Sequence, residues 1–169
     1  MINKYALTSF AAQMSKYTPM DNIILDAPMS EHTTFAVGGP ADILVLPASV
    51  KEMSVAIRIA RSLELPVTVL GGGSNVLVRD GGIRGVVIQL NRLKKVLSCH
   101  DGKMLVSAGY MLKDICQFAQ EQGLTGIEFA CGIPGTLGGA VFMNAGAYGG
   151  EMKQVLQSAR VLTKEGEIQ

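Results

Sequence analysis

Cysteine, net charge and long hydrophobic runs are all scarce in this sequence, and each scarcity excludes a class of protein. The three cysteines, Cys99, Cys116 and Cys131, form no CxxC motif and cannot all pair, which favours reduced thiols in the cytoplasm. A formal net charge of +1 argues against a dedicated nucleic-acid-binding protein. The longest nearly apolar run, Phe129 to Met143, is too short and too rich in glycine to span a bilayer. The polar N-terminus contains no signal-peptide core.

Glycine, by contrast, is abundant and unevenly placed. The chain has 20 glycines in 169 residues, and 17 of them fall between Gly71 and Gly150. Glycine weakens regular structure but allows the backbone to approach a ligand closely. A hydrophobic content of 48% excludes a disordered chain. We therefore expect a folded protein whose second half holds a ligand with its backbone.

The first 70 residues predict a helix followed by a small α/β unit. The opening helix should end before Pro19. A strand over residues 42–46, a helix begun by the capping-box pattern of Ser49 and Glu52, and a strand over residues 66–70 then follow in order. The apolar face expected of the first helix consists of Ile2, Tyr5, Ala6, Phe10, Ala11, Met14 and Tyr17.

The remaining residues predict short strands and one clear helix. Strands are expected at 76–78, 85–90, 94–97 and 104–107, and a helix at 112–121 that Gly123 ends. These elements indicate a mixed α+β (α/β) fold of two small lobes, residues 1–65 and 66–169.

The C-terminal residues predict an incomplete hairpin. Residues 155–163 read as a strand and residues 164–166 as a turn, and residues 167–169 begin a return strand. A strand averages about five to six residues. We therefore expect that a longer polypeptide has been truncated here. A frayed tail is the alternative.

The first glycine-rich segment directly follows a predicted strand, where backbone N–H groups can converge on an anion. It is neither a P-loop nor a Rossmann fingerprint, since GxxxxGK[ST] is absent and Val76 occupies the third glycine position. A tight turn between strands is the competing interpretation. The candidate pyrophosphate-binding residues are Gly71, Gly72, Gly73, Ser74 and Asn75.

The second glycine-rich segment is expected to contain a short helix with Pro134 in its first turn. Its glycines would leave one side of that turn bare for a ligand, or would allow close packing of the helix against a sheet. A single ligand bound by both segments explains their glycines better than a separate structural reason for each segment. The candidate binding residues are Gly132, Ile133, Pro134, Gly135, Thr136, Gly138, Gly139 and Ala140.

Other candidate sites are weaker. His32 and His100 lack partners at metal-ligand spacing and are expected to be solvated, so no metal site is predicted. Cys131 is either a reactive thiol or, as the more ordinary role, a small buried side chain. No nucleophile signature such as GxSxG occurs.

Three segments carry a family resemblance. Residues 33–42 (TTFAVGGPAD), 70–78 (LGGGSNVLV) and 132–148 (GIPGTLGGAVFMNAGAY) occur in this order. Together they resemble the UDP-N-acetylenolpyruvoylglucosamine reductase (UDP-N-acetylmuramate dehydrogenase) family of bacterial peptidoglycan precursor synthesis. More loosely, the chain resembles flavoproteins with the para-cresol methylhydroxylase-type FAD-binding fold.

The resemblance implies that FAD lies between the two lobes, with its pyrophosphate near residues 71–75 and residues 132–140 approaching the flavin. In the family, NADPH reduces the FAD, which passes hydride to the enolpyruvyl group of a UDP-sugar. The protein mainly positions and tunes the cofactor.

The sequence departs from the family in its catalytic motifs. The family's Tyr-Arg motif, its Gly-Ser-Phe-Phe-Lys-Asn-like motif and its C-terminal glutamate have no counterpart here, so no catalytic residue is assigned and these 169 residues alone are expected to be inactive. Ala36 also replaces an often basic residue. A non-catalytic flavin-binding module, and a flavin-dependent oxidase with covalent FAD at Cys131, are the alternatives.

Overall fold

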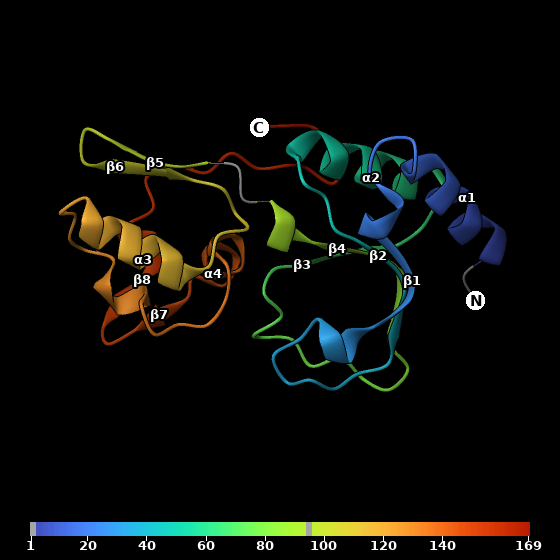
Figure 1. The fold of residues 1–169 in the computed structure, drawn as a ribbon, viewed down its shortest axis with the longest axis horizontal. Helices are drawn as coiled ribbons and strands as arrows, with labels where there is room; N and C mark the ends of the chain where they lie inside the picture. Colours follow the sequence, from blue (N-terminus) through green and yellow to red (C-terminus); the bar gives the residue numbers. More distant parts are fainter. Residues whose placement is uncertain (1–2, 94–95) are drawn as a thin grey trace.

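The structure, a computed structural model, describes residues 3–93 and 96–169. A layered α/β part carries the N-terminal residues, and a second part of short helices and hairpins lies beside it (Figure 1). No helix among the described residues is long and apolar enough to cross a membrane.

A four-stranded sheet, ordered β1-β2-β4-β3, organises the first part. β1 is antiparallel to β2, whereas β2 and β3 are both parallel to β4. The predicted strand–helix–strand unit is therefore confirmed. The strands are β1 (Ile23–Pro28), β2 (Pro40–Val45), β3 (Val67–Leu70) and β4 (Ile83–Gln89).

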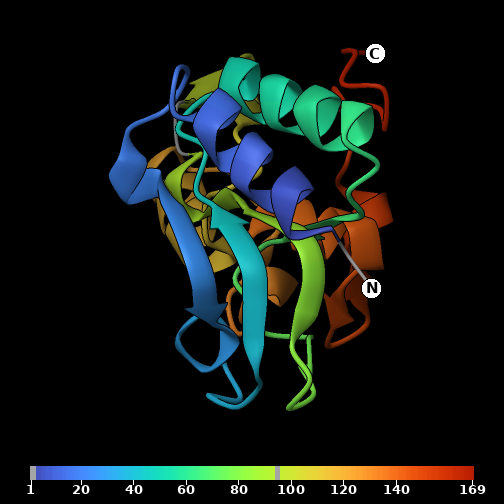
Figure 2. The same ribbon diagram turned by 90° about the vertical axis from the view of Figure 1, so that its right-hand side faces the viewer.

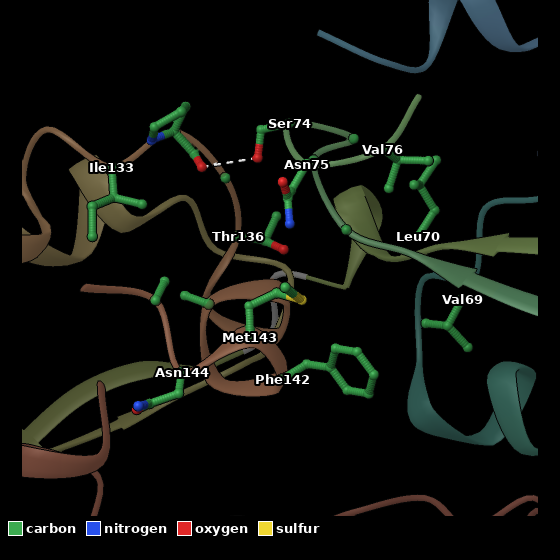
Figure 3. Close-up of a pocket in the computed structure, with 18 of the residues that line it drawn as sticks. Val69, Leu70, Ser74, Asn75, Val76, Ile133, Thr136, Phe142, Met143 and Asn144 are labelled. Atoms are coloured by element: carbon green, nitrogen blue, oxygen red, sulfur yellow. Dashed lines mark hydrogen bonds between the residues drawn. The ribbon is translucent and has the colours of Figure 1, made fainter. Parts of the chain in front are cut away.

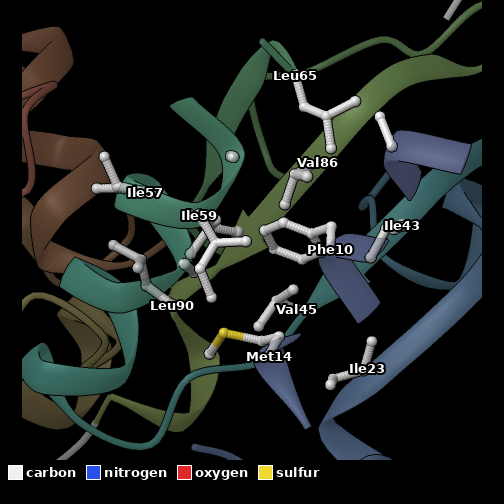
Figure 4. Close-up of a cluster of buried hydrophobic side chains, with 14 of the residues drawn as sticks. Phe10, Met14, Ile23, Ile43, Val45, Ile57, Ile59, Leu65, Val86 and Leu90 are labelled. Carbon is white, nitrogen blue, oxygen red and sulfur yellow. The ribbon is translucent and has the colours of Figure 1, made fainter. Parts of the chain in front are cut away.

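Both faces of the sheet are covered, which explains the continuous apolar runs of its central strands. Helices α1 (Lys4–Met14) and α2 (Val50–Ser62) pack on one face (Figure 2). There, Phe10, Ile57 and Val45 belong to one buried hydrophobic cluster (Figure 4). Successive side chains of a strand alternate between faces, so Leu44 instead packs with loop residues on the other side.

Local signals place the helix ends. Ser49 caps α2 by accepting a hydrogen bond from the Glu52 N–H at 3.2 Å, and its hydroxyl donates to the Glu52 carboxylate at 2.8 Å. The predicted start of the helix at Ser49 is confirmed, and the Glu52 carboxylate reaches back to accept from the Ala48 N–H at 3.0 Å. In α1 the predicted apolar face is partly wrong, because Tyr5 and Tyr17 are exposed. Ile2 lies outside the described residues.

The second part is built around a separate hydrophobic cluster that includes Leu112, Ile115, Ala140 and Met152. The predicted helix at 112–121 is confirmed as α3, and Gly123 follows its end with φ +66°. The helices and strands of this part are β5 (Leu97–His100), β6 (Lys103–Val106), α3 (Leu112–Glu121), α4 (Leu137–Met143), β7 (Gly146–Ala147) and β8 (Gly150–Glu151).

Short 3-10 helices connect these elements. They are η1 (Met20–Asn22), η2 (Met29–Glu31), η3 (Leu90–Arg92), η4 (Glu128–Ala130) and η5 (Met152–Gln154).

Two strand predictions differ from the structure. Residues 76–78 form no strand; Val78 instead turns inward to pack under the sheet while Leu77 is exposed. The strand expected at 94–97 begins at Leu97, and Lys94 and Lys95 lie outside the described residues. Conversely, β1 was not predicted from the sequence.

The C-terminal hairpin is only partly as predicted. Leu162 and Ile168 form an antiparallel bridge, and the Thr163 N–H donates to the Glu167 carbonyl at 2.8 Å. Residues 155–160 form no strand. The turn lies against α2, where the Ser54 hydroxyl donates to the Gly166 carbonyl at 2.6 Å.

The sheet continues across residue 65, because β3 and β4 belong to the same sheet as β1 and β2. The buried residues of the cluster beneath α1 and α2 extend to Leu93, and those of the second part begin at Leu112. The division into lobes of residues 1–65 and 66–169 stays a prediction about domain organisation.

Candidate functional site

The first glycine-rich segment lies at the carboxyl end of β3. In open α/β sheets, ligands bind outside the carboxyl ends of the parallel strands. Residues 71–75 leave the sheet at this edge and turn toward the second part of the molecule (Figure 3).

The two glycine-rich segments meet here, although about 60 residues separate them in the sequence. The Ser74 hydroxyl donates a hydrogen bond to the Pro134 carbonyl at 2.9 Å. A Cβ atom built on Gly72 would lie 3.4 Å from the Gly135 Cα. A Cβ atom on Gly71 would lie 2.4 Å from the Thr136 Oγ1. The two backbones can approach this closely because side chains are missing at the contact.

Between the segments lies a cavity of about 570 Å³, within the usual range for small-molecule sites. No lining side chain is charged. The lining residues are Val69, Leu70, Gly71, Gly72, Gly73, Ser74, Asn75, Val76, Ile133, Pro134, Gly135, Thr136, Gly139, Ala140, Phe142, Met143, Asn144, Ala145 and Gly146.

Backbone N–H groups supply unused donors on one side of the cavity. Within the described chain, the N–H groups of Gly72, Gly73, Ser74 and Asn75 donate no hydrogen bond. Consecutive free N–H groups in a turn form a nest that favours an anion. Such donors can hold an anion at a site whose lining contains no cationic side chain.

Thr136 contributes a buried hydroxyl that lacks a partner. Its side chain is 1% exposed, and its Oγ1 makes no hydrogen bond within the described residues. Such a group costs about 1–3 kcal/mol when left unsatisfied. Thr136 lines the cavity, so a ligand there can satisfy it. A buried, unpaired hydroxyl beside glycines that carry no side chain fits a phosphate-containing cofactor.

The segment at residues 33–42 supports the first glycine loop from behind. The Thr34 N–H donates to the Gly73 carbonyl at 3.0 Å. Gly73 has φ +70°, and a Cβ atom there would lie 2.3 Å from the His32 carbonyl oxygen. Glycine is required at residue 73 both by the left-handed backbone and by this contact. All three segments that carried the family resemblance thus converge.

One detail of the second segment was wrong, and the contact of two of its glycines with a ligand stays a prediction. Pro134 precedes the short helix, because α4 begins at Leu137 with Thr136 as its N-cap residue. Gly132 and Gly138 are not among the residues that line the cavity. A Cβ atom on Gly138 would lie 2.9 Å from the Ala108 Cβ, so this glycine allows close packing.

Sequence reasoning missed an apolar wall on the opposite side of the cavity. Phe142 and Met143 of α4 and Val69 of β3 lie along it (Figure 3). Phe142 is 88% exposed, which is unusual for an unliganded aromatic side chain. The third resembling segment extends to residue 148, and this length was the signal that these positions belong to the site.

The histidines and cysteines lie apart from the cavity. His32 is half-buried and its Nδ1 lies 2.9 Å from the Gln89 Oε1, so the expectation of a solvated side chain was wrong; His100 is exposed. Cys131 is exposed, not a small buried side chain, and does not line the cavity. The described residues contain no group of three or more acidic, histidine or cysteine side chains placed to hold a metal ion.

Comparison with known proteins gives a consistent result. The chain is 46% identical over 167 residues to a UDP-N-acetylenolpyruvoylglucosamine reductase of Clostridium kluyveri, covering 99% of this chain and 54% of that protein. The chain thus spans about half the length of the curated relatives it matches.

Solved structures agree. The reductase of Thermus caldophilus superposes with a TM-score of 0.70 at 36% identity, covering 87% of this chain and 50% of that one. p-Cresol methylhydroxylase superposes with a TM-score of 0.74 at 14% identity, covering 99% of this chain and 36% of that one, which shows a shared fold. Both the reductase resemblance and the fold class are confirmed.

The sequence model of the FAD binding domain family matches residues 41–169, which include both glycine-rich segments and the whole cavity lining. FAD is therefore confirmed as the cofactor of the family, in agreement with the uncharged, donor-rich cradle. The chain belongs to the FAD binding domain family.

Proposed function

We propose that the cavity holds FAD, with the pyrophosphate against residues 71–75 and residues 132–140 alongside the flavin. The observation that carries this proposal is the buried, unpartnered hydroxyl of Thr136 beside a row of free backbone N–H groups. A phosphate oxygen is the kind of acceptor that satisfies both.

In this proposal the protein binds the pyrophosphate without a counter-charge. The N–H groups of residues 72–75 donate to the phosphate oxygens, and the missing side chains of Gly72 and Gly135 leave room for them. Hydrogen bonds to a charged group contribute about 1.5–3 kcal/mol each. Ser74 holds the two segments together through Pro134, so it fixes the width of the cradle.

The apolar wall of Val69, Phe142 and Met143 would exclude water from the flavin side. When bound, FAD supplies hydride-transfer chemistry, while the protein orients the cofactor and tunes its surroundings. The described site holds no charged side chain that would compete with the cofactor for these contacts.

We infer that the complete protein is the NADPH-dependent reductase that converts UDP-N-acetylglucosamine enolpyruvate to UDP-N-acetylmuramate, in cytoplasmic peptidoglycan precursor synthesis. Identity of 46% along 99% of the chain supports this inference. Because the chain covers 54% of that relative, reduction of the UDP-sugar requires residues beyond these 169. This chain then contributes the greater part of the FAD site and no catalytic residue.

Titration of the purified chain with FAD, followed by flavin fluorescence and circular dichroism, tests the proposal. Saturable binding by the folded chain is expected. A folded chain that does not bind FAD would show that these residues do not form the cofactor site by themselves. Addition of NADPH and the enolpyruvyl UDP-sugar to the FAD-loaded chain should give no turnover.

A further inference from the structure

Gln89 is a buried polar residue on a face of the sheet where apolar side chains gather. It ends β4 and is 2% exposed. Side chains alternate along a strand, so Gln89 shares its face with Val87, which belongs to the same hydrophobic cluster as Leu44 and Leu70. Burying an amide costs free energy unless hydrogen bonds replace those made to water. A glutamine at this position therefore needs partners, and both belong to His32.

The Gln89 amide holds His32 at two points. Its Nε2 donates to the His32 carbonyl at 3.4 Å, and its Oε1 lies 2.9 Å from the ring Nδ1. A carbonyl oxygen can only accept, so the first contact fixes the amide orientation and turns Oε1 toward the ring. Because Oε1 also only accepts, Nδ1 carries the proton and donates the second hydrogen bond. One side chain thus fixes both the ring and the backbone carbonyl of His32.

The His32 carbonyl that Gln89 holds also lies against the first glycine-rich segment. A Cβ atom built on Gly73 would lie 2.3 Å from this oxygen and 2.8 Å from the Thr33 Cα. The Thr34 N–H donates to the Gly73 carbonyl at 3.0 Å. The backbone that Gln89 anchors therefore packs directly on Gly73.

Gln89 borders the same segment through the sheet. In the parallel pairing of β3 with β4, Gln89 is the partner of Leu70, the last residue of β3. Gly71 follows Leu70 directly in the sequence. The backbone of Gln89 is thus paired beside the start of the segment, and its side chain supports Gly73 through His32. Residues 71–73 are held from both sides.

We propose that Gln89 and His32 are positioning residues that set the orientation of the free N–H groups of residues 72–75, a role that rests on the proposed binding of FAD there. Neither residue is among those that line the cavity, so each acts on the ligand through the backbone of Gly73. Donors that are already ordered lose less conformational entropy when a pyrophosphate binds. Loss of the Gln89 contacts should therefore weaken FAD binding although no contact with FAD is removed.

Titration of purified variants with FAD tests this role. Gln89→Met keeps the length of the side chain and removes both hydrogen bonds, so the dissociation constant should rise about fivefold, the equivalent of one ordinary hydrogen bond. Gln13→Met is the matched control. It removes the hydrogen bond from a partly buried glutamine to Ser9 within α1, on the opposite face of the sheet, and should leave the affinity unchanged. A Gln89→Met chain that binds FAD as wild type does overturns the proposal.

Variants of His32 separate the hydrogen bond from the packing of the ring. His32→Phe keeps a ring without Nδ1 and should raise the dissociation constant about threefold, whereas His32→Asn supplies an amide donor and should bind FAD within about twofold of wild type. The double variant Gln89→Met/His32→Phe should bind no more weakly than Gln89→Met alone, because both changes break one contact. Additive losses overturn the proposal. If Gln89→Met does not fold, equal affinities of His32→Phe and His32→Asn overturn it.

Hydrogen exchange without FAD separates this role from the proposed function and from a general loss of stability. The Thr34 amide, which donates to Gly73, should exchange faster in Gln89→Met than in wild type or Gln13→Met, beyond any change shared by the amides of β2. A Thr34 rate that does not change, or changes only as β2 does, overturns the positioning role. A wild-type chain that binds no FAD contradicts the proposed function, and Thr34 exchange then decides whether Gln89 holds the segment.

Discussion

At the scale of single residues, the candidate site is tested most directly at the Thr136 hydroxyl and at the close approach of Gly72 to the Gly135 backbone. The hydroxyl is buried and unpartnered within the described chain, and Gly72 faces the backbone of Gly135. Each can be altered without disturbing the hydrophobic clusters that hold the fold.

Replacing Thr136 with valine keeps the shape of the side chain and removes the hydroxyl. Because the unsatisfied group disappears, the free energy of unfolding without FAD should rise by about 1 kcal/mol, while FAD binding weakens by about 1 kcal/mol or more. Denaturant unfolding and FAD titration measure the two effects. Thr8→Val, on the exposed side of α1, is the control. A variant that loses stability yet binds FAD normally would contradict the role given to Thr136.

Replacing Gly72 with aspartate places a negative charge beside the proposed pyrophosphate. Gly72 has ordinary backbone geometry and a Cβ atom there meets nothing closer than 3.4 Å, so the chain should still fold. FAD binding should weaken by about 2–4 kcal/mol. Gly72→Asn isolates the steric part and should weaken binding less. Gly81→Asp adds the same charge in open space and should leave the affinity for FAD unchanged. If Gly72→Asp also leaves the affinity unchanged, the pyrophosphate does not bind beside Gly72.

At the scale of elements, helix α2 depends on its cap. Ser49 accepts the Glu52 N–H, and removing an N-cap hydroxyl costs about 1 kcal/mol. Ser49→Ala should lower the free energy of unfolding by that amount in urea denaturation. Ser62→Ala, near the other end of the helix, should have a much smaller effect. If both variants lose the same free energy of unfolding, the Ser49 hydroxyl contributes no more to stability than the Ser62 hydroxyl does.

The end of α4 is tied to β8 by an acid-dependent contact. The Lys153 ammonium at 2.5 Å, and then the Asn144 amide at 2.6 Å, hold the pKa of Glu151 below its ordinary value. A lowered folded-state pKa stabilises the fold above the unfolded pKa, and this contribution is lost as pH falls through the folded pKa. Wild type should therefore exceed Glu151→Gln in stability at neutral pH, and the difference should shrink in acid. Denaturation at a series of pH values measures it, and a pH-independent difference would contradict the assignment.

At the scale of the whole molecule, FAD should act as a link between the two parts. The cavity is lined by β3 and its loop from one part and by α4 from the other. A ligand that binds only the folded chain raises its stability by about 2.7 kcal/mol at a concentration 100 times its dissociation constant. The thermal midpoint should rise with FAD concentration, and hydrogen exchange should slow in both parts. Protection confined to one part would contradict a shared site.

Much of the fold was predictable because its signals are local. The cap at Ser49, the apolar face of α3 and the positive φ of Gly123 all arise within a few residues of sequence. β1 was missed because its pairing with β2 joins segments that no short-range pattern connects. Pro134 was misplaced for a similar reason, since distant residues hold the start of α4: Thr136 forms a bridge with Met111, and the Leu137 N–H donates to the Tyr110 carbonyl at 2.8 Å.

The sequence by itself led to the prediction that two glycine-rich segments share one ligand, and it identified the family that they resemble, because glycine placement and motif order are properties of the chain. Only the tertiary structure decided how the segments meet. The Ser74–Pro134 hydrogen bond joins residues that are 60 positions apart, and the Thr136 hydroxyl is buried against the distant Gly71. Burial and free hydrogen-bonding groups are properties of packing, and packing exists only once the distant segments come together.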